Sequence, residues 1–233
     1  MTADSQLRQG NDARFADRRD AGRQLASALR EYAHRSDVLV LGLPRGGVPV
    51  AAEVAAALDA PLDVIIVRKL GVPGHEELAM GAVASGGVTV FNHDIIGRMG
   101  IPQAAINRVT AIELAELARR DRAFRGDAPP IDAAGRVAIL VDDGLATGAT
   151  MAAAVEAVHF MRPARIVVAV PVASVDATLA LRRAADAVVS VMQPEPFYGV
   201  GKWYDDFAQT SDDEVRQLLT ASHERPLARA GTP

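Results

Sequence analysis

The segment at residues 138–150 constrains the fold more than any other part of the chain. It reads Ala-Ile-Leu-Val-Asp-Asp-Gly-Leu-Ala-Thr-Gly-Ala-Thr, an apolar run that meets two adjacent acids and then a loop of small and hydroxylated residues. The apolar run is typical of a buried strand, so Asp142 and Asp143 lie at its carboxyl end, where open α/β sheets bind ligands. The loop can turn backbone N–H groups toward an anion beside the N-terminus of the next helix. The pattern indicates a ligand with hydroxyls and a phosphate, such as ribose 5-phosphate; an ordinary turn at a strand end is the alternative.

Strand-like and helix-like segments alternate along most of the chain. The order of strand, loop, helix and strand predicts βαβ units and therefore an α/β fold, with an open, mainly parallel twisted sheet flanked by helices. A hairpin turn is expected at Gly86-Gly87, and residues 68–78 are expected to form a mobile loop. The predicted strands are 38–41, 64–67, 80–83, 88–91, 137–141, 166–171 and 187–191, and the predicted helices are 15–33, 48–58, 102–125, 149–161, 175–183 and 211–220.

Composition excludes several classes of protein. The 233 residues are 49% hydrophobic and 23% charged, enough for one large domain with a sizeable core. A net charge of −4 argues against nucleic acid as a partner, and the absence of cysteine excludes a disulfide framework. No signal-like segment and no apolar stretch of membrane-spanning length is present, so we expect a cytoplasmic protein without a membrane partner. We expect one domain over residues 1–224, with a core at 36–192, a hood at 193–222 and a flexible tail at 225–233.

The thirteen residues 138–150 resemble the signature of type I phosphoribosyltransferases that binds phosphoribosyl pyrophosphate (PRPP). The resemblance implies that Asp142 and Asp143 are catalytic and hold the ribose hydroxyls. It implies that the 5′-phosphate is bound by Gly144, Leu145, Ala146, Thr147, Gly148, Ala149 and Thr150. Gly144 departs from the usual aliphatic residue and is expected to loosen the loop. The implied reaction transfers the 5-phosphoribosyl group to a nitrogenous base or related acceptor and releases pyrophosphate, with Mg²⁺ delivered mainly by PRPP near the two acids.

Two further segments are similar to the pyrophosphate-binding parts of that family. Pro44-Arg45-Gly46-Gly47 follows the first core strand, where Arg45 supplies charge and the glycines allow close approach of the backbone. The family loop often has a strained or cis peptide, and a plain glycine-rich turn is the alternative reading. Arg68 and Lys69 are expected at the end of the next core strand, on the same edge, where the resemblance implies a catalytic, pyrophosphate-binding role. A solvated strand end is the alternative for this pair.

Residues 70–78 match the place of a flexible loop that closes over the substrates and excludes water in the family. Gly71, His75, Glu76 and Glu77 belong to it. Five of the ten large aromatic residues lie at 194–207, where the resemblance implies an acceptor-binding hood. Stacking on a flat base is one interpretation of this group, and a hydrophobic plug is the other. The aromatic candidates are Phe197, Tyr198, Trp203 and Tyr204.

Four further points concern the function and the charges. Ala146 stands where 6-oxopurine enzymes of the family carry an acid, which argues against hypoxanthine or guanine as the acceptor. A non-catalytic protein that senses PRPP or a nucleotide is the second functional hypothesis, and the resemblance implies a homodimer. A nucleotide-dependent reductase is rejected, since residues 42–47 lack G-x-G-x-x-G spacing. The basic cluster Arg18, Arg19 and Arg23 is interpreted as a solvated helix face rather than a phosphate patch.

Overall fold

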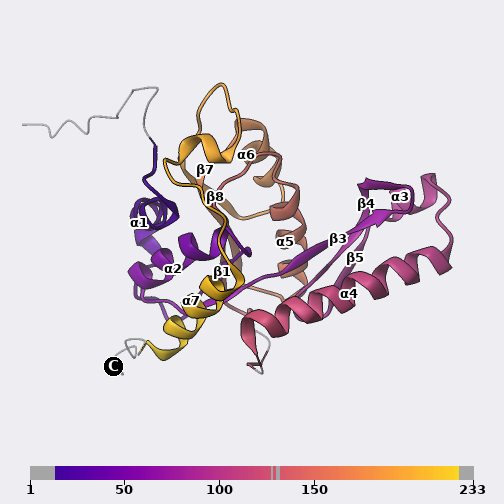
Figure 1. Ribbon diagram of the computed structural model, residues 1–233, viewed down its shortest axis with the longest axis horizontal. Coiled ribbons are helices and arrows are strands. Elements are labelled where there is room, and N and C mark those ends of the chain that lie inside the picture. The colour runs from indigo at the N-terminus through magenta and orange to yellow at the C-terminus, as the bar shows by residue number, and fades with distance from the viewer. Residues whose placement is uncertain (1–13, 127, 130–131, 226–233) are drawn as a thin grey trace, which may run out of the picture.

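Within the described residues of the computed structural model, 14–126, 128–129 and 132–225, five parallel strands form the main sheet (Figure 1). Their spatial order is β2-β1-β6-β7-β8, and each neighbouring pair runs parallel. Residues 1–13 and 226–233, and with them the predicted tail beyond residue 225, lie outside the described part. The strands are β1 Val38–Gly42, β2 Leu62–Val64, β6 Val137–Val141, β7 Arg165–Val172 and β8 Ala187–Met192.

Helices cover both faces of the main sheet, which explains why its central strands are apolar on both sides. β1 and β6 are buried at every position. Val38 and Val40 pack toward α1, α2 and α7, whereas Leu39 and Leu41 pack toward α5 and α6. The predicted α/β fold with a mainly parallel sheet is therefore confirmed. These helices are α1 Arg18–Ala28, α2 Gly47–Leu58, α5 Ala149–Phe160, α6 Val175–Leu181 and α7 Asp212–Glu224.

A second, antiparallel sheet extends from the body together with two helices, and we call residues 67–125 the arm (Figure 1). The hairpin turn at Gly86 and Gly87 is confirmed, since φ is +83° and +78° there and β4 pairs with β5. The long helix α4 packs along this sheet. The elements of the arm are β3 Val67–Val72, β4 His75–Ala84, β5 Val88–Phe91, α3 His93–Arg98 and α4 Gln103–Arg125.

The prediction of a loop at residues 68–78 is wrong in its secondary structure. β3 and β4 pair as a hairpin, and only residues 73–74 lie between them as a turn. The predicted strand 64–67 is also divided, because β2 ends at Val64 and β3 begins at Val67. The hairpin has irregular register around Gly71, and its tip at 75–77 is exposed. Backbone pairing therefore builds these strands where the side-chain pattern contains polar residues and loop-forming glycines.

The two ends of the described chain pack against each other. α1 begins at Arg18, later than predicted, because the side chain of Asp17 accepts a hydrogen bond from Asp20 N at 2.7 Å and caps the helix. Phe15 instead forms an isolated bridge with Tyr204. Ser211 caps α7, since its Oγ accepts a hydrogen bond from Glu214 N at 3.1 Å. The short helices η1 Arg30–Tyr32 and η2 Val200–Trp203 complete these segments.

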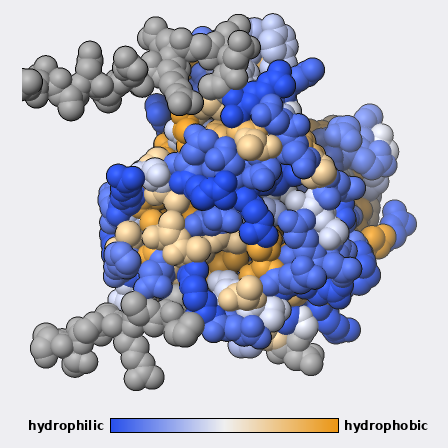
Figure 2. All heavy atoms as spheres, turned by 60° about the vertical axis from the view of Figure 1, so that its left-hand side comes forward, coloured by the Kyte–Doolittle hydropathy of each residue, from blue (hydrophilic) through white to orange (hydrophobic). Residues whose placement is uncertain are grey.

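The surface over α1, α2 and α7 is mostly hydrophilic. Figure 2 shows this face, with smaller hydrophobic areas between the hydrophilic side chains. Among the described residues, no helix combines the length and the apolar character needed to cross a bilayer.

Arg125, at the end of α4, joins the arm to the main sheet. Its Nε donates to Oδ1 of Asp63 at 2.8 Å, and its Nη1 donates to Oδ1 of Asp121 at 2.7 Å. Nη2 also donates to the carbonyl of Val64. Burial raises the pKa of Asp63, and the charge of Arg125 opposes that rise. The buried guanidinium therefore supplies hydrogen bonds to the carboxylates and the carbonyl at this junction, which offsets the cost of burying them.

Arg125→Met should lower the free energy of unfolding by about 3–5 kcal/mol, because it leaves the carboxylate of Asp63 buried without its partner. Arg122→Met is the matched control, since Arg122 is an exposed arginine on the same helix. The control should change stability by less than about 0.5 kcal/mol. Urea denaturation of both variants measures the difference, and equal losses would contradict the role of Arg125.

Candidate functional site

The ends of β1 and β6 meet where the strand order of the main sheet reverses. From β1 the chain continues to β2 on one side, and from β6 it continues to β7 and β8 on the other. Open α/β sheets bind ligands at such a switch point. A Cβ on Gly46 would collide with the carboxylate of Asp143. A Cβ on Gly47 would lie 2.8 Å from Cα of Asp142, so the two loops pack too closely for larger residues.

The signature loop, residues 144–150, is tied to the end of β7 and borders a small hollow. Leu145 N donates to the carbonyl of Val172 at 2.9 Å, and Ser174 Oγ donates to the carbonyl of Ala146 at 2.7 Å. α5 begins at the wall of this hollow, where its first N–H groups lack partners inside the helix. The hollow has a volume of about 190 Å³ and is lined by Asp142, Gly144, Leu145, Ala146, Thr147, Gly148, Ala149, Thr150, Met151 and Val200. The arrangement suits a small anion such as a phosphate.

The residues of the signature loop are not equivalent. Thr147 and Thr150 are not buried, whereas the side chain of Leu145 is buried in the core and its carbonyl accepts a hydrogen bond from Ser174 N at 2.9 Å. The expected loosening at Gly144 is not found. A Cβ there would lie 2.6 Å from Cγ1 of Val200, so Val200 fills the space that an aliphatic side chain would take. This valine, from the C-terminal segment, is a site residue that the sequence pattern did not reveal.

Asp142 and Asp143 are largely buried and have different partners. Oδ1 of Asp142 accepts from Asp143 N at 2.9 Å. Oδ2 of Asp143 accepts from Nε of Arg18 at 2.9 Å and lies 2.8 Å from its Nη2. Burial, then the neighbouring charge of Asp143, raises the pKa of Asp142 well above its ordinary value. Burial also raises the pKa of Asp143, while Arg18 opposes that rise.

The interpretation of Arg18 as part of a solvated helix face is wrong. Its guanidinium stacks 3.9 Å above the ring of Phe207 and donates to the carbonyl of Ala208 at 2.6 Å, in addition to its pair with Asp143. Arg19 and Arg23 do lie at the surface. The sequence signal was weak, because only the packing of α1 against the main body separates Arg18 from its neighbours.

The aromatic residues of the C-terminal segment mostly support the site rather than face a ligand. Tyr204 is buried, and its hydroxyl donates to the carbonyl of Asp143 at 2.6 Å. Its ring packs on Phe15 and Phe207, with centroid separations of 5.4 and 5.0 Å. Stacking of Tyr204 on a base is therefore corrected to a structural role, because its side chain is enclosed by this packing. Among the other candidates, Phe197 and Trp203 pack against this cluster and Tyr198 is exposed.

Arg68 and Lys69 lie on β3 of the arm, not at the end of a parallel strand as expected. They line a hollow of about 770 Å³ between β3, β4 and α4, which reaches Ala149 and Thr150 beside the signature loop. Arg68 donates through Nε to Oε2 of Glu113 at 2.7 Å. Lys69 lies 3.2 Å from Glu77. Gly71, Glu76 and Glu77 also line this hollow, and His75 is exposed at the start of β4.

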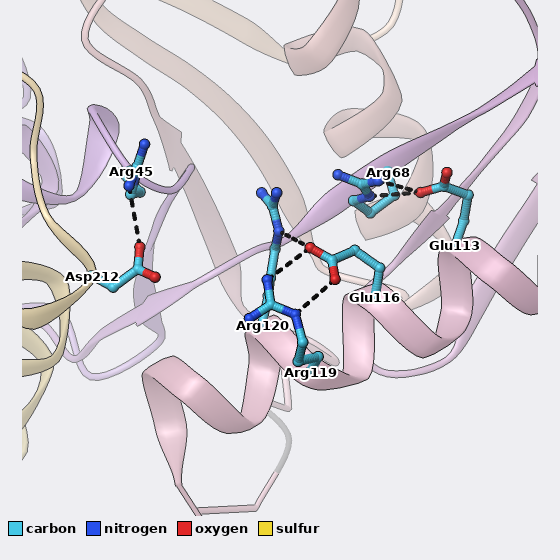
Figure 3. Close-up of polar contacts among 7 residues, drawn as sticks. All are labelled: Arg45, Arg68, Glu113, Glu116, Arg119, Arg120 and Asp212. Carbon is cyan, nitrogen blue, oxygen red and sulfur yellow. Dashed lines mark hydrogen bonds and ion pairs between the residues drawn. The ribbon is translucent and has the colours of Figure 1, made fainter.

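Arg45, in the loop after β1, is partly exposed and faces α7 and α4. Its Nη1 donates to Oδ1 of Asp212 at 3.4 Å, and Figure 3 shows this pair opposite the arginines of α4. The peptide bond between Pro44 and Arg45 is cis. Arg45 and the backbone of Gly46 and Gly47 thus lie at the same edge as the acids.

Comparison with known proteins identifies the family. A family model described as "Phosphoribosyl transferase domain" matches residues 15–201. The chain belongs to this family. A protein of Mycobacterium tuberculosis strain H37Rv, named "Putative phosphoribosyl transferase", is 48% identical over 217 residues, which cover 93% of this chain and 48% of that protein. The chain therefore spans about half the length of this relative.

Two other comparisons extend over most of the phosphoribosyltransferase domain. The "Bifunctional protein PyrR" of Roseiflexus sp. strain RS-1 is 30% identical over 171 residues, covering 68% of this chain and 70% of that protein. The crystal structure of TT1426 from Thermus thermophilus has a TM-score of 0.81 at 43% identity, covering 89% of this chain and 98% of that one. The fold of this phosphoribosyltransferase domain is thus shared with a solved structure.

Asp142→Asn should stabilise the phosphoribosyltransferase domain at neutral pH. A raised pKa means that the ionised carboxylate is unfavourable in the folded state. This cost grows as the pH rises from the pKa of the unfolded state through the higher pKa of the folded state. Asparagine keeps an oxygen acceptor for Asp143 N without the charge. We expect a gain of about 0.5–2 kcal/mol in the free energy of unfolding at pH 7.

The gain should be smaller at pH 5, where Asp142 carries less charge in the folded protein. Chemical denaturation at both pH values measures it, with Glu156→Gln as an exposed control. A gain at pH 5 that equals or exceeds the gain at pH 7 would contradict the assignment of the cost to Asp142.

Proposed function

We propose that the chain transfers the 5-phosphoribosyl group of PRPP to a nitrogenous base or a related acceptor and releases pyrophosphate. The main support is that two acids, the signature loop and the loop 43–47 share one switch point of the sheet. The reaction breaks the bond between C1 of the ribose and the pyrophosphate oxygen. A bond forms from the acceptor nitrogen to the same carbon, and pyrophosphate leaves with both electrons.

Each part of the site has a distinct task in this proposal. The carboxylates of Asp142 and Asp143 accept hydrogen bonds from the vicinal ribose hydroxyls. The N–H groups at the start of α5, with Thr147 and Thr150, bind the 5′-phosphate. Arg45 and the backbone of Gly46-Gly47 bind the pyrophosphate and stabilise the negative charge that develops as it leaves.

Arg18 and Tyr204 act as positioning residues. Arg18 holds Asp143 by two nitrogen contacts and favours its ionised form, because its charge opposes the effect of burial on the pKa. Tyr204 holds the main chain at the same residue through its hydroxyl. The acid is therefore oriented before a ribose arrives, which lowers the entropy lost on binding.

The donor atoms of this site fit Mg²⁺ that arrives with PRPP. Asp142 and Asp143 supply carboxylate oxygens, but within the described residues no group of three or more His, Asp or Glu side chains could hold a metal. Mg²⁺ commonly keeps several waters and shares substrate phosphates with one or two carboxylates, which this set allows. When bound, the ion would neutralise charge on the pyrophosphate.

The arm supplies the far wall of the proposed cleft. Arg68 and Lys69 line the large hollow beside Thr150, close to the start of α5. The β3–β4 hairpin, with Gly71, Glu76 and Glu77 in the same lining, is placed to cover bound substrates and limit hydrolysis of PRPP by water. Tyr198, with 76% of its surface exposed, is the aromatic candidate most open to an acceptor.

Arg45→Ala should weaken PRPP and inorganic pyrophosphate by about tenfold or more, because it removes charge-assisted hydrogen bonds to the pyrophosphate. Ribose 5-phosphate lacks that group and should bind within about twofold of the unaltered chain. Calorimetric titration of all three ligands, with the exposed Arg30→Ala as control, measures the split. Equal weakening of PRPP and ribose 5-phosphate would place Arg45 elsewhere.

The decisive experiment follows pyrophosphate release from PRPP and Mg²⁺ in the presence of a panel of nitrogenous bases. Release with one base identifies the acceptor, and Asp143→Asn should abolish both PRPP binding and release while the protein stays folded. Tight PRPP binding without release on any base would instead support a sensing protein on the same fold. No PRPP binding at all would contradict the proposed function.

A further inference from the structure

A third hollow, between the arm and the loop 43–47, gathers arginines from outside the signature. It has a volume of about 220 Å³ and is lined by Arg45, Arg119, Arg120, Ala123, Phe124 and Asp212. These residues come from the loop after β1, from the C-terminal half of α4 and from the first turn of α7. The hollow therefore adjoins the proposed pyrophosphate loop, but its remaining cations belong to the arm.

Glu116 holds the two arginines of α4 together. Arg119 donates to both carboxylate oxygens of Glu116, through Nε at 2.7 Å and Nη2 at 2.9 Å. Arg120 donates to Oε1 through Nε at 2.8 Å. In Figure 3 the terminal nitrogens of Arg120 turn away from Glu116, toward the space between Arg45 and Arg68. This guanidinium is thus fixed at one edge and open at the other.

The charges around the hollow leave an excess of cations. Three guanidinium groups face two carboxylates, those of Glu116 and Asp212. Arg119 and Arg120 lower the pKa of Glu116 to about 2, so its carboxylate stays ionised and keeps them paired at neutral pH. The contact of Arg45 with Asp212 is long, at 3.4 Å, and both side chains are exposed. Exposed pairs of this kind contribute little, so an anion can compete with them.

We propose that this hollow binds a diphosphate group, with Arg119 and Arg120 as ligands opposite Arg45. Guanidinium groups bind phosphate oxygens through paired N–H donors, and two or more of them suit a diphosphate. Arg45 lines the hollow and is joined directly to Gly46, which packs on Asp143, so the hollow adjoins the loop that approaches the proposed ribose acids. The inference rests on the proposed function in one respect: the diphosphate is that of PRPP or of released pyrophosphate.

Calorimetry of the full chain with inorganic pyrophosphate and Mg²⁺ tests this site. The double variant Arg119→Met with Arg120→Met should bind pyrophosphate at least about tenfold more weakly. Arg122 lies on the same helix but does not line the hollow, and Arg122→Met removes the same charge as either single substitution. The Arg122→Met variant should therefore bind pyrophosphate within about twofold of the unaltered chain. Arg120→Met alone should also bind pyrophosphate more weakly while its thermal midpoint stays unchanged. This single variant keeps the test valid if the double variant does not fold.

Two results would overturn the inference. One is unchanged pyrophosphate affinity in the double variant, and the other is an equal loss in Arg122→Met, which would reveal a general effect of charge. Failure of the proposed function gives a different result. In that case the chain would bind pyrophosphate through Arg119 and Arg120 but would neither bind PRPP nor turn it over. The diphosphate site would then stand, and the proposed transferase function would be rejected.

Discussion

The site depends on the close packing of two loops at the reversal of strand order in the main sheet. Gly46 and Gly47 allow the backbone after β1 to approach the acids after β6, where any Cβ would collide. This packing removes water from the carboxylates, which raises the pKa of both Asp142 and Asp143. The same contact that brings the proposed ribose and pyrophosphate subsites together therefore also creates an electrostatic cost that the rest of the protein must offset.

Segments far from the signature in the sequence supply that compensation. Arg18 comes from α1 and pairs with Asp143, while Tyr204 comes from the C-terminal segment and donates to the main chain of the same residue. Phe207 connects them, since it lies under the guanidinium of Arg18 and against the ring of Tyr204. The two ends of the described chain thus act as one support for one carboxylate, which explains why aromatic residues gather there.

The parallel sheet and the signature loop were predictable because their signals are local. Buried parallel strands are apolar throughout, and Asp142 and Asp143 directly follow such a strand. The sequence therefore shows both the strand and the acids at its carboxyl end. Arg18 and Val200 were not predictable, since their roles depend on contacts between segments far apart in the sequence. The prediction of a loop at residues 68–78 was wrong for another reason. The strands of the β3–β4 hairpin are held by backbone pairing, and their polar, glycine-containing sequence resembles that of a loop.

One helix of the arm, α4, carries cations that line two hollows beside the loops of the main sheet. Arg125 anchors the end of α4 to β2 through a buried set of hydrogen bonds, and Arg119 and Arg120 lie within about two turns of that anchor. Further toward the N-terminus, Glu113 pairs with Arg68 of β3, so the same helix also positions a cation in the larger hollow. Because a helix is stiff over this length, displacement of α4 at the anchor would move both groups of cations relative to Arg45. The buried junction at Arg125 therefore holds the helix that carries both groups of cations.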